Sequence, residues 1–478
     1  MTILQLIQNF FQTHDHQFFY LFLGYFLYAN SIYLVLLALA VVSVRKQIRM
    51  RPLIDLLQSG LPSFAPSISV IAPAYNEEKT IVESVRSLLL IHYSNFDIVI
   101  VSDGSKDGTV ELLKSAFLMK EVELPYDGSL SSTTIRATYR SLLHPNLVLV
   151  DKLNGGKADA LNVGIGFAPS QLICCVDSDS ILEETSLIRV AAPFMEEPDT
   201  VIASGGTIRI ANGATIKNGR VVDVQIPKSY LILVQIIEYT RAFLCGRIGW
   251  NTVNSTLVIS GAFGLFNKAR VIEVGGYRAD CIGEDMDLVI RLHRHCRKNN
   301  YDYKIVFVPD PVCWTEVPST LSVLKRQRDR WQRGLADSLR QNYQIFLNPS
   351  YGWIGFLAFP YLLLVELLGP VVEMLSLVYI LSGVFFGTAS PQSLALVLLA
   401  SIFYSAVISM GSIVIEEIYF SKYGQVRQFL MLFFGSLLES LGFKQLTSFW
   451  RFLALFKYAM GDKSWGKMRR TGFERKEP

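Results

Sequence analysis

Charged residues are scarce in this sequence: they make up 18% of its 478 residues, whereas apolar residues make up 51%. Globular domains usually carry about 25% charged residues, so the composition favours a protein with membrane-spanning segments. The net charge is only +4, and so small an excess does not predict a nucleic-acid partner. The length also exceeds that of one ordinary domain.

Cysteine and histidine are rare as well, with six of each. The cysteines show neither disulfide nor metal-site spacing, and Cys174-Cys175 lies in an apolar run typical of a buried strand. His293 and His295 are two positions apart, and such positions do not share a helical face. The sequence therefore predicts neither a disulfide framework nor a histidine metal pair.

Two common nucleotide-binding signatures are missing. The sequence contains no GxGxxG motif. The segment before Lys157 is not a P-loop, because Asp151 stands where the first glycine would be and Ala158 where serine or threonine would be. These absences exclude the usual dinucleotide and P-loop sites, and no internal repeat is visible.

A first membrane segment is expected at residues 17–44, which carry no charge and are long enough to cross a bilayer core of about 30 Å. A basic cluster follows directly, at Arg45, Lys46, Arg49 and Arg51. Because positive charge favours the cytosolic side, residues 1–16 are expected outside and the linker 45–66 inside the cell.

A second membrane region is expected at residues 349–460. Residues 353–388 are apolar except for Glu366 and Glu373, and Gly369-Pro370 predicts a break. The two glutamates share a helical face, so they line a polymer path or face water from an interfacial helix. Residues 393–414 predict a crossing, and the short runs 429–441 and 446–460 predict a tight hairpin or a re-entrant pair. The basic tail 461–478 is expected in the cytosol, which makes this a multi-pass cell-membrane protein.

Residues 67–348 have the composition of a globular domain. Apolar runs at 68–72, 97–101, 147–150 and 171–176 alternate with helix-length amphipathic stretches at 79–91, 108–117 and 156–167. This alternation predicts βαβ units and a mostly parallel α/β sheet. Ligands of such sheets bind beyond the carboxyl ends of the strands. The polar segment 121–146 is expected to be a surface insertion.

Polar side chains gather at the expected strand ends. These ends contain Pro73, Tyr75 and Glu77, then Asp103, and then Asp177 and Asp179. Two carboxylates two residues apart suit a hard divalent cation that substrate phosphates complete. Aspartate is also common in turns, so this pair alone decides little.

Two further groups suit phosphate and sugar. Gly155-Gly156-Lys157 offers close backbone approach and a positive charge at a helix start. Gln327, Arg330 and Trp331 occupy positions i, i+3 and i+4 of one helical face. A basic helix beside lipid headgroups would also explain the charge there, but it would not explain the alignment of Trp331 with Gln327.

Taken together and in order, these motifs resemble those of the family 2 glycosyltransferases, and the layout is most similar to membrane-embedded polysaccharide synthases that make poly-N-acetylglucosamine, hyaluronan, chitin or cellulose. The resemblance covers residues 67–334 and the flanking membrane helices. It implies the GT-A fold, a UDP-sugar donor and Mg²⁺ or Mn²⁺. One departure is Ser102, where the family often has a first aspartate before Asp103.

The resemblance also implies roles for individual residues. Asp285 is the expected general base, which takes a proton from the acceptor hydroxyl. Its neighbours Glu284 and Asp287 share that role or cap a helix N-terminus, and we favour a structural role for Asp287. Nucleotide-sugar binding falls to Pro73, Tyr75, Glu77, Asp103, Lys157, Asp177, Gln327, Arg330 and Trp331; metal binding to Asp179; and acceptor binding to Gly261, Glu284 and Trp314.

The sequence thus predicts an inverting, processive membrane glycosyltransferase that adds sugar from a UDP-sugar, with UDP-N-acetylglucosamine favoured, to a polysaccharide and exports it. One alternative is a non-processive enzyme that adds a single sugar to a lipid-linked acceptor. The non-enzymatic alternative is a transporter with a nucleotide-sensing domain.

Overall fold

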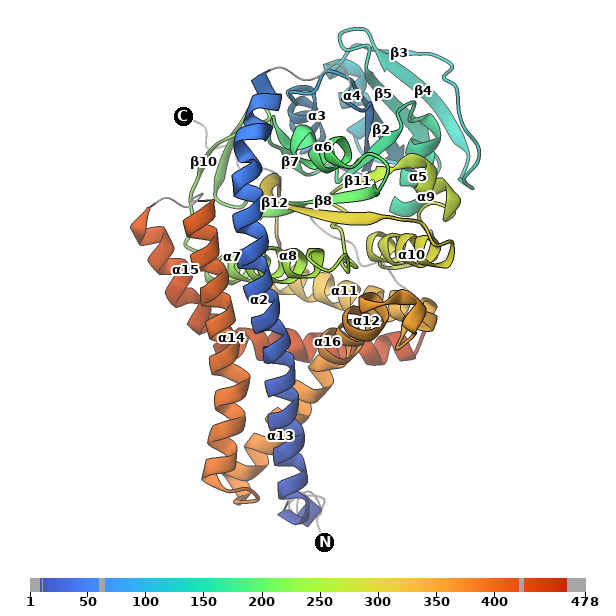
Figure 1. Ribbon diagram of the computed structural model, residues 1–478. Coiled ribbons are helices and arrows are strands. Elements are labelled where there is room, and N and C mark those ends of the chain that lie inside the picture. The colour runs from blue at the N-terminus through green and yellow to red at the C-terminus, as the bar shows by residue number, and fades with distance from the viewer. Residues whose placement is uncertain (1–8, 11, 60–64, 421–424, 462–478) are drawn as a thin grey trace.

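The computed structural model describes residues 9–10, 12–59, 65–420 and 425–461. The basic tail after Gly461 and the side chains of Lys46, Arg49 and Arg51 lie outside the described part. Figure 1 shows three levels: a sheet flanked by helices, a middle layer of helices that lie across the molecule, and a bundle of long helices that extends away from the sheet.

A ten-stranded mixed sheet forms the first level, in the order β3-β4-β5-β2-β1-β6-β11-β8-β12-β7. Its strands are β1 (Ile68–Ala74), β2 (Phe96–Asp103), β3 (Met119–Glu121), β4 (Ile135–Ser141), β5 (Leu147–Lys152), β6 (Leu172–Val176), β7 (Ile181–Leu182), β8 (Val201–Ile210), β11 (Phe263–Asn267) and β12 (Lys304–Thr315). The strands β5, β2, β1 and β6 are parallel. The four predicted strands are confirmed at these positions.

The strand order places the ligand crevice. From β1 the chain adds β2 and β5 on one side and β6 on the other, so the strand order reverses between β1 and β6. Open α/β sheets bind their ligands at such a reversal. The strand β11 runs antiparallel to β6 with Phe263 opposite Val176. This register brings the loop before β11 beside the end of β6.

Helices cover both faces of the sheet. On one face lie α3 (Ile81–Leu89), α4 (Thr109–Ala116) and α6 (Ser186–Glu196), whose apolar side chains share one core with the strands. On the other lie α5 (Lys157–Phe167), α9 (Lys268–Glu273) and α10 (Glu284–Lys298). The three predicted helices correspond to α3, α4 and α5.

The segment 121–146 is more than a surface insertion. It holds β4, which pairs antiparallel with β5 and with β3 and so extends the sheet at its edge. A smaller hairpin of β9 (Ala214–Lys217) and β10 (Arg220–Val224) stands apart from the sheet.

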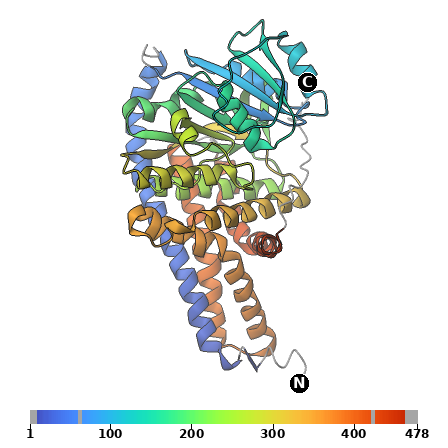
Figure 2. The same ribbon diagram turned by 90° about the vertical axis from the view of Figure 1, so that its right-hand side faces the viewer.

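The middle layer lies between the sheet and the bundle (Figures 1 and 2). It contains α7 (Tyr230–Thr240), the π-helical turn η1 (Arg241–Arg247), α8 (Ile248–Asn251), α11 (Leu321–Gln341), the short turns η2 (Tyr343–Ile345) and η3 (Pro349–Tyr351), the run η4 (Ile354–Ala358), α12 (Phe359–Tyr361) and η5 (Leu362–Leu367), and α16 (Lys444–Ala459). The first half of the apolar stretch 353–388, before the break at Gly369-Pro370, forms the run from η4 to η5.

Three straight apolar helices form the bundle in Figure 1: α2 (Asp15–Ser59), α13 (Gly369–Phe386) and α14 (Pro391–Tyr419). The helix α2 continues through the expected linker to Ser59. The break expected at Gly369-Pro370 is present, because α13 begins there.

A fourth stretch, Val426–Ala459, is long and apolar enough to span a membrane, but it is not straight. It consists of α15 (Val426–Leu438), the turn η6 (Glu439–Phe443) and α16, and the backbone leaves helical geometry at Leu441 and Gly442. In Figure 1, α16 lies across the bundle instead of returning beside α15. The tight hairpin, one of the two arrangements expected here, is therefore not what the structure shows; the re-entrant pair stays a prediction.

Candidate active site

Lys157 and Asp177 meet where α5 begins and β6 ends. Lys157 Nζ lies 2.5 Å from Asp177 Oδ1 and 3.8 Å from Glu284 Oε1. Burial alone would lower the pKa of Lys157, but Asp177 and Glu284 outweigh it and raise that pKa above its usual range. This lysine therefore stays protonated and carries a fixed positive charge beside the strand end.

Asp285 lies in the first turn of α10 and is held by backbone groups. Its Oδ2 accepts a hydrogen bond from the Gly261 N–H at 3.0 Å, and its Oδ1 accepts one from the Met286 N–H at 2.8 Å. A Cβ atom at Gly261 would lie 3.1 Å from Lys157 Nζ and 3.2 Å from Asp285 Oδ2. Because Gly261 has no side chain, Asp285 and Lys157 can both lie next to it.

Glu284 is buried next to the partly exposed Asp285. Burial raises the pKa of the Glu284 carboxyl to about 7, against the opposing effect of Lys157, while the charge of Asp285 raises it further. The Glu284 carboxyl can therefore carry a proton near neutral pH.

Helix α11 brings the predicted Gln327, Arg330 and Trp331 to this site. A Cβ atom at Gly334 would lie 3.1 Å from Gly283 Cα, so only a glycine lets α11 approach the start of α10 this closely. Gln327 is buried and its Oε1 has no hydrogen-bond partner among the described residues. Trp331 remains 42% exposed, a large value for a tryptophan inside a protein.

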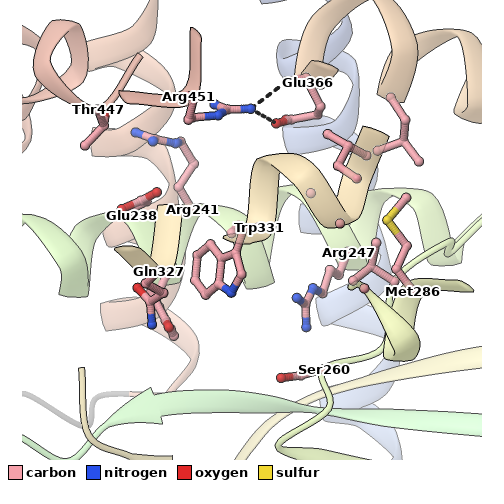
Figure 3. A pocket seen from close by; sticks show the side chains of 18 of the residues that line it. Glu238, Arg241, Arg247, Ser260, Met286, Gln327, Trp331, Glu366, Thr447 and Arg451 are labelled. Carbon is pink, nitrogen blue, oxygen red and sulfur yellow. Dashed lines mark hydrogen bonds and ion pairs between the residues drawn. The ribbon is translucent and has the colours of Figure 1, made fainter. Parts of the chain in front are cut away.

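These groups line one cavity of about 710 Å³. Nine of the predicted site residues lie on its wall: Lys157, Asp177, Asp179, Gly261, Glu284, Asp285, Gln327, Arg330 and Trp331. The close-up in Figure 3 shows the indole of Trp331 between two levels, with Ser260 on the side of the sheet and Arg451 and Glu366 on the side of the bundle.

Other predicted residues lie beside this cavity instead of on its wall. Tyr75 is 46% exposed at the end of β1, next to Pro73 and Glu77. Their loop is tied to the loop after β2, because the Asn76 side chain accepts a hydrogen bond from the Lys106 N–H at 2.8 Å. These residues border the strand crevice, where their role as the nucleoside end of the site stays a prediction.

Asp103 is 4% exposed, and its carboxylate is surrounded by donors. The backbone N–H groups of Gly155 and Gly156 donate to it at 2.9 and 2.8 Å, Asn154 Nδ2 donates at 3.1 Å, and Lys152 forms an ion pair with it. The structure therefore shows Asp103 holding the loop that leads to Lys157. This arrangement leaves little room for the direct uridine contact that the resemblance implies.

Trp314 does not reach the cavity. Its ring is 1% exposed within β12, and its Nε1 donates to Glu183 Oε1 at 3.2 Å. A sugar cannot stack on a ring this buried, so the expected stacking role is wrong in this structure. The residues that follow in the chain, from Thr315 to Ser319, do line the cavity.

Several acidic residues near the motifs are structural, as expected for Asp287. Asp287 accepts from Arg291 Nε at 2.7 Å and is fully buried. Asp329 pairs with Arg333 on its own helix and with Lys457 of α16 at 2.8 Å.

The sequence motifs miss the part of the wall that faces the bundle. There the cavity is lined by ion pairs between different elements: Arg241 with Glu439 at 2.9 Å, and Arg451 with Glu366 and Lys444 with Glu373, both at 3.4 Å. Their partners are far apart in the chain, so no local pattern identifies them. Only Glu366 and Glu373 were singled out from the sequence, and both line the cavity.

Two models of known protein families match the part of the chain that contains the sheet and the site. The model of glycosyl transferase family 2 matches residues 69–249, and that of glycosyl transferase family group 2 matches residues 172–408. Together the two matches cover the sheet, the cavity wall on the side of the sheet, helix α13 and part of α14. This chain is a family 2 glycosyltransferase. Its sheet domain has the GT-A fold, as the motifs predicted.

Relatives of this glycosyltransferase include two curated proteins named poly-β-1,6-N-acetyl-D-glucosamine synthase. The protein from Staphylococcus epidermidis is 28% identical over 277 residues, which are 58% of this chain and 56% of that protein. The protein from Staphylococcus aureus (strain COL) is 28% identical over 301 residues, 63% of this chain and 60% of that protein. The matched part thus spans less than two thirds of each relative.

Among solved structures, a mannosyltransferase from Pyrobaculum calidifontis in complex with GDP-Man and Mn²⁺ aligns with a TM-score of 0.43 and 17% identity, over 87% of this chain and 99% of that one. The S. aureus protein TarS (residues 1–349) in complex with UDP-GlcNAc aligns with a TM-score of 0.36 and 17% identity, over 75% and 92%.

Proposed function

We propose that this glycosyltransferase is an inverting, processive membrane enzyme that transfers N-acetylglucosamine from UDP-N-acetylglucosamine to a growing polysaccharide and passes the polymer into the membrane. One observation carries the proposal: a single cavity joins Asp177, Asp179 and Asp285 at the sheet to Glu366 and Glu373 among the bundle helices. An enzyme that released a short product to the cytosol would not need this extension.

The choice of donor rests on the relatives, whose names specify an N-acetylglucosamine polymer. The wall on the bundle side agrees with such a product. Its cations Arg241, Lys444 and Arg451 each have a carboxylate partner. An uncharged polymer can pass this wall without requiring new counter-charges, whereas an anionic polymer would have to displace these partners.

The site fits a divalent metal in the way that Mg²⁺ or Mn²⁺ usually binds. Asp177 and Asp179 both line the cavity. No group of three or more ligating side chains is found among the described residues, so the donor diphosphate and water would supply the remaining ligands. We assign the metal to Asp179. A bound cation would neutralise charge that develops on the leaving diphosphate.

The proposed chemistry is a single displacement. The acceptor hydroxyl attacks the anomeric carbon, the new C–O bond forms as the bond to the diphosphate breaks, and UDP leaves with the bonding electron pair. Asp285 takes the hydroxyl proton. Lys157 and Arg330, which both line the cavity, would hold the diphosphate. Attack from the face opposite to the leaving group inverts the anomeric centre.

The direct test is UDP release by the purified protein with a panel of UDP-sugars, with and without Mn²⁺. The proposal expects the highest rate with UDP-N-acetylglucosamine, loss of release after chelation, and a product of many sugars. Equal or faster release with a UDP-hexose lacking the N-acetyl group would contradict the choice of donor.

The two alternatives give different results in the same assay. A non-processive enzyme would yield acceptors extended by one sugar. A transporter with a nucleotide-sensing domain would show no transfer that depends on Asp285.

A further inference from the structure

Arg247 differs from the other cations of the cavity wall. Arg241, at the opposite end of the same turn η1, is paired with Glu439 at 2.9 Å, and Lys157 is paired with Asp177. Arg247 Nη1 is buried and has no hydrogen-bond partner within residues 9–10, 12–59, 65–420 and 425–461. A buried N–H donor without an acceptor is costly, so a ligand that accepts hydrogen bonds would stabilise this side chain.

An aromatic ring packs against one face of the Arg247 guanidinium. Its guanidinium carbon lies 3.9 Å from the centroid of the Phe243 ring, and Phe243 is buried. Cation–π contact of this kind holds the planar group while leaving its N–H edge available. Short π-helical turns such as η1 occur often at functional sites. Figure 3 shows the guanidinium in the same space as the Trp331 indole, above Ser260.

Arg247 and Lys157 line the same cavity but have different charged neighbours. Lys157 interacts electrostatically with Asp177, Glu284 and Asp285. Arg247 shares with it only Asp285, and burial lowers the pKa of the Arg247 guanidinium to about 10, which Asp285 opposes. The donor diphosphate belongs with Lys157 and Asp177. Arg247 lines the cavity together with Asp285, Ser260 and Trp331, and we take this part of the wall as the acceptor side of the base.

The space next to Arg247 is open. A Cβ atom at Gly246 would have no atom within 4 Å, and both residues line the cavity. The exposed face of Trp331 borders the same space. A sugar ring combines a face that stacks on an indole with a rim of oxygens that accept hydrogen bonds. This chemistry matches a terminal sugar of the acceptor.

We propose that Arg247, at the end of η1, donates hydrogen bonds to the terminal sugar of the acceptor chain and positions its hydroxyl next to Asp285. The inference rests on the proposed function, because it requires an acceptor sugar. It assigns Arg247 to the acceptor and not to the donor diphosphate.

The test separates the two substrates. UDP release from UDP-N-acetylglucosamine without acceptor gives the donor KM, and transfer to a short β-1,6-linked N-acetylglucosamine oligosaccharide gives the acceptor KM. In R247M the acceptor KM should rise about 10-fold or more, as expected for loss of a hydrogen bond from a charged donor. The donor KM should stay within about 2-fold. R247K keeps the positive charge but loses the planar set of N–H donors of the guanidinium, so the acceptor KM should rise by about 3-fold.

R270M is the matched control, because Arg270 also lies over an aromatic ring, 4.2 Å from the Tyr301 centroid, but away from the cavity. It should leave both constants unchanged. A raised donor KM in R247M, or an unchanged acceptor KM in both Arg247 variants, would overturn the inference. If R247M does not fold, R247K alone decides. If the wild-type protein transfers no sugar, the proposed function fails instead.

Discussion

The two ends of the cavity are built on different principles. At the sheet, carboxylates and cations come from short local motifs, and among the described residues Gln327 Oε1 and Arg247 Nη1 on the cavity wall have no hydrogen-bond partner. Toward the bundle, Arg241, Lys444 and Arg451 are matched with carboxylates of other elements. The contrast agrees with the proposed function, in which the first end reacts with the substrate and the second lets the polymer pass.

The largest effect should come from removing the base at the sheet end. D285N keeps the size of the side chain, and its oxygen can still accept from the Gly261 N–H. Because a general base contributes about 10²- to 10⁴-fold, sugar transfer should fall by that factor while binding of UDP persists. The rate of transfer and the Kd for UDP are the measurements. Transfer within about 3-fold of the wild type would contradict the role of Asp285.

The close approach of α10 and α11 can be broken without touching a reacting group. In G334A the new Cβ would lie 3.1 Å from both Gly283 Cα and Gly283 N, and backbone atoms cannot yield as a flexible side chain does. We expect a loss of about 10-fold in kcat/KM as Gln327 and Trp331 shift away from Asp285.

G24A is the control for that experiment, since a Cβ at Gly24 of α2 meets nothing within 4 Å. Its rate should equal that of the wild type. Equal rates in G334A and G24A would show that the contact between the helices does not position the site.

The bundle end should affect product length more than the rate of transfer. Glu366 accepts from the Tyr33 and Tyr361 hydroxyls at 2.7 and 2.8 Å and pairs with Arg451. In E366Q the charge balance is lost, so we expect polymers about 2- to 5-fold shorter, with a rate on short acceptors within about 2-fold of the wild type. Product size by gel electrophoresis is the measurement.

E273Q serves as its control, because Glu273 pairs with Arg270 on the protein surface. Product length should not change in E273Q. If E366Q reduced the rate and left the length unchanged, the two ends of the cavity would not be distinct.

The smallest effect should be a pH shift at the sheet end. The folded-state pKa of Glu284 is raised to about 7 from 4.5, so this carboxyl is protonated below pH 7 and ionised above it. A raised carboxyl pKa means that the folded state loses stability as pH rises from about 4.5 to about 7. E284Q should lack this loss in thermal unfolding and should flatten the limb of the rate profile near pH 7. If the pH–rate profile of E284Q near pH 7 equalled that of the wild type, a group other than Glu284 would be responsible for that part of the profile.

The same contrast explains how much the sequence predicts. The parallel strands and the carboxylates at their ends follow from local alternation and motifs. Strand β4 was not predicted from the sequence. Most of its residues are partly exposed, and its apolar residues Ile135, Ala137 and Tyr139 are separated by polar ones within a longer polar stretch. Burial is not encoded locally either, which is why Trp314 looked like a binding surface and proved to be core.

Other features depend on tertiary contacts. No pattern around Asp103 predicts that Lys152 and the Gly155-Gly156 backbone occupy its oxygens. Arg247 lies in an apolar stretch without a motif, and only the fold shows that it lines the same cavity as Asp285.

The central claim is that catalysis at the sheet is joined to passage through the bundle. It is tested most directly by reconstituting the protein in liposomes, adding UDP-N-acetylglucosamine outside, and treating the product with an N-acetylglucosaminidase that cannot cross the bilayer. The account predicts polymer that resists the enzyme until detergent is added, and none with D285N. Polymer that is fully degraded without detergent would contradict it.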